Sequence, residues 1–301
     1  MPEVEVSADL AKCLIEKHFA ELAGVSVEPF ARGWDNVAYR VDGRLIFRFP
    51  QRRVAVPLIE VEVALLPWLA PRLPFAVTAP THVARPVGDY AFPFAGYPEL
   101  RGTTACRAVL DVAARRALGA PLGRALRALH GIDVGAAAAA GAPPDRLGRA
   151  DVDRYMGLGR DRMVGALSGP HAELAGRALR VLDDTYGDVA PRGGGTERRL
   201  VHGDLYARHV IVRDGVFVGL IDWGDVHLGD PALDLGVAHA LLPPDAHATF
   251  RAAYGPISAA AWSRARFRAA FYVTALLAYG WDAGDVALLD EATTALGFLE
   301  A

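Results

Sequence analysis

The chain has 301 residues, of which 52% are hydrophobic, and this is enough to bury a sizeable core in one or two domains. Its 35 acidic and 32 basic residues give a formal net charge of -3, so no basic excess is available to bind a nucleic-acid backbone. Cys13 and Cys106 show no CxxC or Cys/His spacing, which leaves no basis for a disulfide framework or a zinc site.

The N-terminus carries no targeting pattern. Residues Met1 to Glu5 are acidic and lack the basic and apolar regions of a signal peptide. No run of about 18 uninterrupted apolar residues occurs in the chain. We therefore expect a cytoplasmic, monomeric protein that has neither a membrane nor a nucleic acid as its partner.

The first hundred residues predict a helix followed by a three-stranded meander. Residues 7–23 begin at Ser7 and place apolar residues at roughly helical spacing. Three β-rich stretches follow at 25–30, 37–41 and 45–49. A turn at Asp42-Gly43 separates the last two, and the apolar segment 58–66 predicts another helix.

The character of the chain changes near residue 101. Proline-rich residues 71–100 give way to an Ala-, Leu- and Arg-rich helical pattern that runs to about residue 186. A stripe of leucines in this pattern predicts a buried helix face that ends at His130, which we interpret as a helix-end residue. Low-complexity tracts at 135–144 and 191–196 predict loops.

Two strands joined by an Asp-Gly turn, at 210–212 and 216–221, predict a β-hairpin in the second half of the chain. Because a hairpin returns the chain to its starting point, we expect Asp204 and Asp222 at the same end, with His209 near them. Phosphoryl transfer from a nucleotide needs one carboxylate to orient an acceptor hydroxyl and another to hold Mg²⁺. The spacing of Asp204 and His209 also equals the Asp to Asn spacing of the kinase catalytic loop.

Three motifs carry a resemblance to a known family. HGDLYARH at 202–209, IDWGD at 221–225 and GDPALD at 229–234 resemble the aminoglycoside and macrolide phosphotransferases, which are relatives of the protein kinases. The resemblance implies an α+β, two-lobed, protein-kinase-like fold. Its small antiparallel-sheet N-lobe corresponds to residues 1–100, and its larger, mainly helical C-lobe corresponds to residues 101–301.

The resemblance also implies roles for the residues of the hairpin region. Asp204 corresponds to the catalytic base and Asp222 to the principal Mg²⁺ ligand, while His209 stands where kinases carry Asn. Since Mg²⁺ prefers oxygen ligands, Asp222 is the firmer of the two metal candidates. Asp230 precedes a proline at a predicted helix start, which favours a structural role over a metal contact.

On the nucleotide side, the kinase lysine of the third strand has no lysine counterpart here, because Lys12 and Lys17 both precede the predicted sheet. The position falls on Arg48, whose guanidinium keeps its charge and binds phosphate through a planar fork. Its predicted partner is Glu62, which directly precedes an apolar run, in preference to Glu60.

Further nucleotide contacts follow from the same resemblance. The loop that contains Gly33 and Asp35 lies where kinase-like enzymes cover the phosphates, although a single glycine is a weak phosphate-loop signal. The segment before residue 101 resembles the hinge whose backbone bonds the purine edge, which points to Tyr97, Pro98, Glu99 and Leu100. Either ATP or GTP is the expected donor.

The acceptor is a small molecule whose identity the residues leave open. Aminoglycosides are polycations and need carboxylates around them, yet residues 101–200 and 239–301 together hold 17 acidic and 20 basic side chains. The catalytic-loop pattern is more similar to the macrolide enzymes, so we lean to an antibiotic acceptor of that type. The alternatives are an aminoglycoside phosphotransferase, a metabolic small-molecule kinase of the same superfamily, and a nucleotide-binding pseudokinase that regulates a partner.

Overall fold

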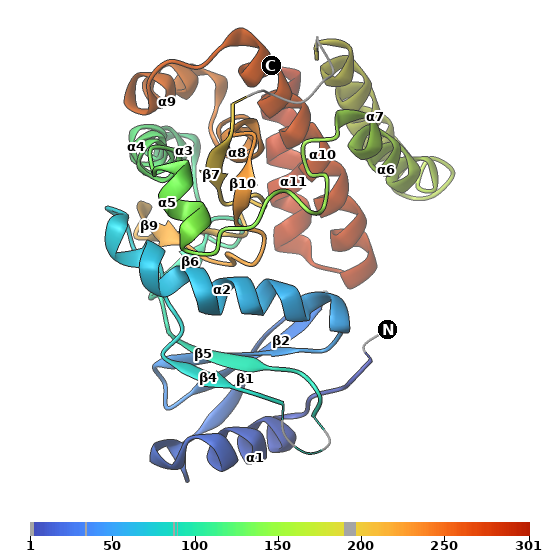
Figure 1. The fold of residues 1–301 in the computed structure, drawn as a ribbon. Helices are drawn as coiled ribbons and strands as arrows, with labels where there is room; N and C mark the ends of the chain where they lie inside the picture. The colour runs from blue at the N-terminus through green and yellow to red at the C-terminus, as the bar shows by residue number, and fades with distance from the viewer. Residues whose placement is uncertain (1–2, 34, 87, 89, 190–196) are drawn as a thin grey trace. The chain divides into compact units, whose positions relative to one another are not determined.

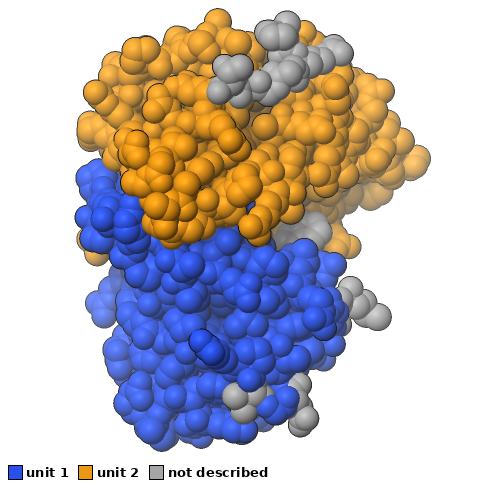
Figure 2. All heavy atoms as spheres, viewed as in Figure 1, with its two compact units in different colours: residues 1–101, 222–225 blue, residues 102–221, 226–301 orange. Residues whose placement is uncertain are grey.

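The computed structural model describes residues 3–33, 35–86, 88, 90–189 and 197–301, so the predicted loop at 191–196 lies outside the described residues. The chain divides into two compact units, coloured separately in Figure 2. Unit 1 contains residues 1–101 together with 222–225, and unit 2 contains residues 102–221 and 226–301. Each unit has its own secondary structure and is described by itself.

Unit 1 is built on a five-stranded antiparallel sheet in the order β1-β2-β3-β5-β4. The strands are β1 (Val27–Arg32), β2 (Asn36–Val41), β3 (Leu45–Pro50), β4 (His82–Ala84) and β5 (Phe94–Pro98). At the β2–β3 turn, Asp42 and Gly43 have φ of 53° and 59°, the left-handed geometry of a tight hairpin that Asp-Gly sequences favour. The predicted meander is therefore confirmed.

Helices cover both faces of this sheet (Figure 1). They are α1 (Ala8–His18), which Ser7 caps, and α2 (Val56–Leu69), with short 3₁₀ turns at Ala20–Leu22, Arg53–Ala55 and Ala70–Arg72. Phe47 and Phe49 point into the core that α1 covers, and both are fully buried. Since side chains alternate along a strand, Arg48 is directed to the other face, where α2 lies.

The segment Arg53–Arg72, which includes α2, is by length and composition the one described helical stretch that could cross a membrane, and 33% of its most apolar window is buried. Core helices of globular proteins pass the same test. In this segment Glu62 is buried and paired with Arg48 of the neighbouring sheet.

Unit 2 is mainly helical, and α10 is its longest helix. The helices are α3 (Val112–Ala117), α4 (Gly119–His130), α5 (Val134–Ala139), α6 (Val152–Val164), α7 (Ala172–Gly187), α8 (Ala232–Leu241), α9 (His247–Tyr254), α10 (Ala259–Ala283) and α11 (Val286–Glu300), with a 3₁₀ turn at Pro244–Ala246. Helix α10 packs against α6, α7, α8 and α11. An antiparallel sheet in unit 1 and helices in unit 2 confirm the α+β prediction.

The loop prediction for residues 135–144 was wrong in its first half, because Val134–Ala139 form helix α5. Alanine has the highest helix propensity of all residues, and the Asp133 side chain accepts the backbone N–H of Ala136 as an N-cap. Low complexity in this tract therefore reflects a short helix that needs no larger side chains.

The predicted hairpin is present in unit 2. Its strands are β8 (Val210–Arg213) and β9 (Val216–Leu220), which pair antiparallel with Val210 opposite Leu220. Strand β6 (Thr103–Thr104) pairs with β8, and β7 (Arg199–Val201) pairs with β10 (His227–Gly229). The N–H of Ile221 donates to the His209 carbonyl over 3.0 Å, so the pairing continues up to the residue before Asp222.

A buried ion pair joins α3 to α11 and yields a stability prediction. Arg115 donates to Glu291 over 3.0 and 2.5 Å, and the two side chains are 7% and 3% exposed. Glu291→Ala leaves a buried cation without its partner, so we expect a loss of about 3–5 kcal/mol in the free energy of unfolding, measured by urea denaturation. Glu300→Ala removes the partner of Arg177 from a pair about one-third exposed, and we expect at most about 1 kcal/mol. Equal losses in the two variants would contradict this.

Candidate active site

A buried carboxylate holds the loop that presents Asp204. Asp234 of α8 is 0% exposed and accepts hydrogen bonds from the backbone N–H groups of His202 (2.7 Å) and Gly203 (2.9 Å) and from Nε2 of His130 (3.0 Å). Burial acts to raise the pKa of Asp234, but the His130 hydrogen bond and the backbone donors outweigh it, so this pKa lies below its ordinary value. The backbone immediately before Asp204 is therefore fixed by an ionised side chain.

The carboxylate of Asp204 is oriented by two donors from other elements of unit 2. Arg149, in the segment before α6, places Nη1 3.2 Å from Oδ1, and Tyr272 of α10 donates its hydroxyl to the same oxygen over 3.0 Å. The Asp204 side chain is 22% exposed, so solvent and small molecules can reach it. A partly exposed, ionisable carboxylate on a rigid loop can accept the proton of a hydroxyl group.

Two histidines support the same loop. His202 is fully buried, which lowers its pKa, and its Nε2 bonds the carbonyl of Ile221 over 3.0 Å, so it joins the loop to the end of the hairpin. His209 places Nδ1 2.7 Å from the backbone carbonyl of Asp204. Because Nδ1 is used in this way, a direct metal bond from His209 would have to come from Nε2.

In unit 1, Arg48 lies between two carboxylates. Its Nη1 contacts Glu62 at 2.8 Å and its Nη2 contacts Asp222 at 2.7 Å, while Glu60 is exposed. The Tyr97 hydroxyl donates to Glu62 over 2.5 Å. Burial opposes the charge of Arg48, but Asp222 and Glu62 outweigh it and hold the pKa of Arg48 well above its usual range. The structure thus pairs Arg48 with Glu62, as predicted.

Asp222 has features that fit a Mg²⁺ ligand. Its φ of 65° lies in the left-handed region, which is uncommon for residues other than glycine and is concentrated at functional sites. Its side chain is 43% exposed, so its oxygens are accessible. Among the described residues, no three His, Cys, Asp or Glu side chains gather as a metal cluster. A single carboxylate still suits Mg²⁺, which is commonly held by one or two carboxylates together with substrate phosphates and water.

The other predicted nucleotide residues have local partners within unit 1. Gly33 donates its N–H to the Asn36 carbonyl over 2.9 Å, and Asp35 pairs with Arg52 at 2.7 Å. Glu99 pairs with Arg40 at 2.7 Å, while Pro98 ends β5 and Leu100 follows it. Nucleotide contacts by Gly33, Asp35 and the segment 97–100 stay predictions.

Sequence reasoning did not assign roles to Asp234, Arg149, Arg268 and Tyr272. Arg268 of α10 is 3% exposed and donates through Nη2 to the Tyr272 hydroxyl over 3.2 Å, which in turn donates to Asp204. A usable signal was present for one of these residues. Asp234 is a single acidic residue within an otherwise apolar helical stretch, and such residues are rarely buried without a specific partner.

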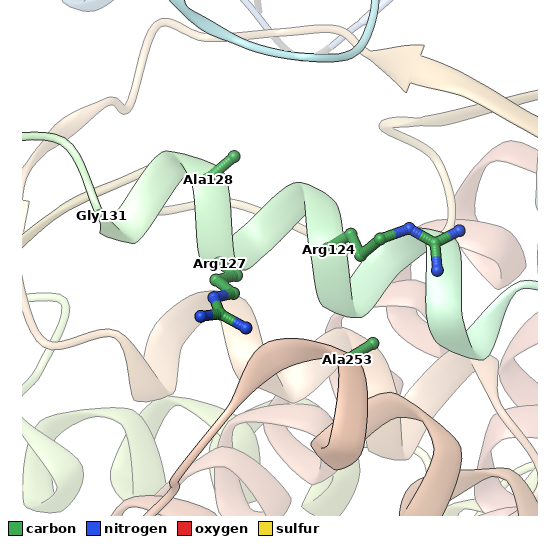
Figure 3. Close-up of a pocket in the computed structure, with 5 residues that line it drawn as sticks. All are labelled: Arg124, Arg127, Ala128, Gly131 and Ala253. Atoms are coloured by element: carbon green, nitrogen blue, oxygen red, sulfur yellow. The ribbon is translucent and has the colours of Figure 1, made fainter.

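A surface hollow of about 490 Å³ lies between α4 and α9 (Figure 3). It is lined by Arg124, Arg127, Ala128, Gly131 and Ala253. None of these residues belongs to the predicted site.

The comparison with known proteins agrees with the fold and the motifs. A sequence model described as the phosphotransferase enzyme family matches residues 26–269. No curated protein sequence matches the chain. Three solved structures illustrate the fold. The GDP and kanamycin complex of APH(2")-IIia has a TM-score of 0.69 at 22% identity, with 96% of this chain and 98% of that chain covered.

The other two are macrolide enzymes. Macrolide 2'-phosphotransferase MphH from Brachybacterium faecium gives a TM-score of 0.60 at 24% identity, covering 96% of this chain and 98% of that one. Macrolide 2'-phosphotransferase type I gives 0.61 at 22% identity, covering 98% of both chains. These likenesses confirm the predicted kinase-like fold.

An antiparallel-sheet unit, a helical unit and an Asp-bearing loop held from a buried helix define a kinase-like phosphotransferase. The chain belongs to the phosphotransferase enzyme family.

The hydrogen bonds to Asp234 yield a prediction about stability and pH. Asp234→Asn replaces an acceptor oxygen with a donor that faces backbone N–H groups, so we expect a loss of about 2–4 kcal/mol in the free energy of unfolding at pH 7. The pKa of Asp234 is lower in the folded state than in the unfolded state, where it is about 3.9. The contribution of Asp234 to the free energy of unfolding is therefore complete above the unfolded-state pKa and is lost as pH falls through the folded-state pKa. In urea denaturation between pH 7 and pH 3, the gap between wild type and variant should therefore stay constant down to about pH 4 and narrow below it. A gap that changes between pH 7 and pH 5 would contradict this assignment.

Proposed function

We propose that the protein transfers the γ-phosphoryl group of ATP or GTP to a hydroxyl group of a small molecule. Asp204 orients the hydroxyl and accepts its proton, after which the oxygen attacks phosphorus and the nucleoside diphosphate leaves. The single observation that supports this most strongly is the Asp204 loop, which is clamped by the buried Asp234 carboxylate. Positioning contributes most of the catalysis in phosphoryl transfer, so a rigid mounting for the base is what this chemistry needs.

The nucleotide half of the proposal rests on unit 1. Asp222, with His209 as the weaker candidate, would hold Mg²⁺, which supplies charge neutralisation at the phosphates when it is bound. Arg48 would steady the phosphates, and Glu62, held by Tyr97, keeps its guanidinium in place. The buried Arg48–Glu62 pair corresponds to the Lys–Glu pair of kinases, with the planar guanidinium in place of an ammonium. A cytoplasmic location is part of the same proposal.

The acceptor class is the open part of this proposal. The similar structures include complexes and enzymes named for both aminoglycosides and macrolides. Arg149 and Arg268 near Asp204 disfavour a polycationic aminoglycoside, because like charges repel in a partly desolvated site. Between the two antibiotic classes the macrolide type is therefore the less disfavoured, because it carries fewer cationic groups than an aminoglycoside. A metabolic small-molecule kinase uses the same residues, and a pseudokinase is disfavoured because Asp204 and Asp222 are both present.

The catalytic roles predict large losses of turnover without loss of the fold. Asp204→Asn keeps the size of the side chain but removes the base, so we expect kcat to fall by roughly 10²–10⁴-fold. Asp222→Asn removes the proposed metal ligand, and its activity should recover in part as the Mg²⁺ concentration is raised. The measurement is acceptor-dependent release of ADP or GDP, with macrolides, aminoglycosides and hydroxylated metabolites as acceptors.

Asp214→Asn is the matched control for these variants. It makes the same chemical change at the turn of the same hairpin, where φ is 52° and Asn tolerates the left-handed conformation. Its activity should stay near that of the wild type. A correctly folded Asp204→Asn protein with near-normal turnover would sink the assignment of the base, and acceptor-independent nucleotide binding without any transfer would favour the pseudokinase.

A further inference from the structure

Three arginines of unit 2 are connected to Asp204 or to one another through short contacts. We refer to Arg149, Arg162 and Arg268 as the arginine cluster. Arg149 contacts Asp204 directly at 3.2 Å. Arg268 reaches it through the Tyr272 hydroxyl, by hydrogen bonds of 3.2 and 3.0 Å. Arg162 of α6 lies 4.8 Å from the centre of the Phe271 ring, against which Arg268 also lies at 5.1 Å. Two cations are therefore linked to the Asp204 carboxylate, and Arg162 lies close to one of them, Arg268.

Among the described residues, the guanidinium groups of Arg268 and Arg162 have donor atoms without a hydrogen-bond partner. Arg268 is 3% exposed, and its Nε and Nη1 have no hydrogen-bond partner among the described residues. The same holds, within the described chain, for Nη1 of the half-buried Arg162. Burial of a charge is costly unless it is paired and hydrogen-bonded, so buried donors of this kind call for a water, an ion or a ligand group as their partner.

Aromatic rings hold the guanidinium of Arg268 in place without satisfying its N–H groups. Its Cζ lies 4.5 Å from the Tyr155 ring centre and 4.6 Å from that of Tyr272. Cation–π contacts of this kind stabilise the positive charge, but they leave donors available at the edge of the guanidinium. Burial lowers the pKa of Arg162; Tyr155 acts to raise it, and repulsion from Arg268 lowers it further. The two cations are thus close enough to disfavour each other, which a shared anion would relieve.

On the basis of the proposed phosphotransferase function, we propose that the acceptor carries an anionic oxygen group, a carboxylate or a phosphate, which the arginine cluster binds while Asp204 orients the acceptor hydroxyl. A planar guanidinium binds both groups through two parallel N–H donors. The anion belongs to the acceptor in this proposal because the cluster lies on α6, on α10 and before α6 in unit 2, whereas the predicted phosphate contact, Arg48, lies in unit 1. An anionic acceptor would also draw Arg149 away from Asp204 and leave the base available to the hydroxyl.

A matched series of acceptors tests which sign of charge on the acceptor the site prefers. Four acceptors share one sugar ring and differ in one group: methyl glucoside, methyl glucuronide, methyl glucoside 6-phosphate and methyl glucosaminide. Kanamycin and erythromycin complete the set. We expect kcat/KM for nucleotide release to be at least tenfold higher with the carboxylate or phosphate member than with the neutral and cationic members. The carboxylate and phosphate arms distinguish the two sources of the anion.

Variants of the cluster separate acceptor binding from nucleotide binding. Arg268→Met and Arg162→Met keep side-chain length and should raise the KM of the anionic acceptor at least tenfold, while the nucleotide KM stays unchanged. Arg268→Lys keeps the charge and should retain part of the preference, which shows that any loss in Arg268→Met is not a folding defect. Arg160→Met is the control, because it removes the same charge from α6 where Arg160 pairs with Asp183 at 2.6 Å.

Inorganic sulfate gives a measure that does not depend on turnover. Sulfate should raise the Tm of the wild type and of Arg160→Met by equal amounts. The rise in Tm should be clearly smaller for Arg162→Met and Arg268→Met. Equal shifts in all four proteins overturn the anion proposal, as does a preference for methyl glucosaminide, kanamycin or erythromycin over the anionic members. A preference for one of those non-anionic acceptors would leave the phosphotransferase function intact. If no acceptor causes nucleotide release but sulfate still binds selectively, the phosphotransferase function is contradicted and the anion site is not.

Discussion

The hydrogen bonds from the His202 and Gly203 backbone to the buried Asp234 carboxylate are the constraint on which the Asp204 loop depends. Two backbone donors and His130 Nε2 converge on one side chain that is 0% exposed. An ionised carboxylate is stable at such a depth only when donors surround it, so the loop and the carboxylate stabilise each other. Asp204 follows this fixed backbone directly, and Arg149 and Tyr272 then set the orientation of its side chain.

Arginine takes the place of lysine throughout the polar interior, and its geometry matters. The flat fork of Arg48 contacts Glu62 with one nitrogen and Asp222 with the other, which a single ammonium on a flexible stem does less precisely. Arg268 uses the same planarity differently, since it stacks against aromatic rings and donates one edge to Tyr272. The first arrangement neutralises a cation with carboxylates, whereas the second leaves a buried cation in need of an anion.

Much of the fold could be predicted because its signals are local. The Asp-Gly turns at residues 42–43 and 214–215 marked both hairpins, and the leucine stripe of α4 marked a buried helix face. Helix α5 was missed because its decisive features are one capping bond from Asp133 and intrinsic alanine propensity, which low complexity concealed. The pairing of Arg48 with Glu62 and not Glu60 could be anticipated from motif position, and Tyr97 as a third member could not.

The sequence by itself determined the β-meander and the second hairpin. It also determined the family through its three motifs, and Asp204 and Asp222 as the residues on which a phosphotransferase proposal rests. Periodicity, turn chemistry and motif spacing are short-range properties, and each can be seen within about ten residues. Only the tertiary structure decided that Asp234 clamps the Asp204 loop and that Tyr272 donates to the Asp204 carboxylate. These contacts join residues that are 31 to 68 positions apart. Their formation depends on how α8 and α10 pack, which no local pattern specifies.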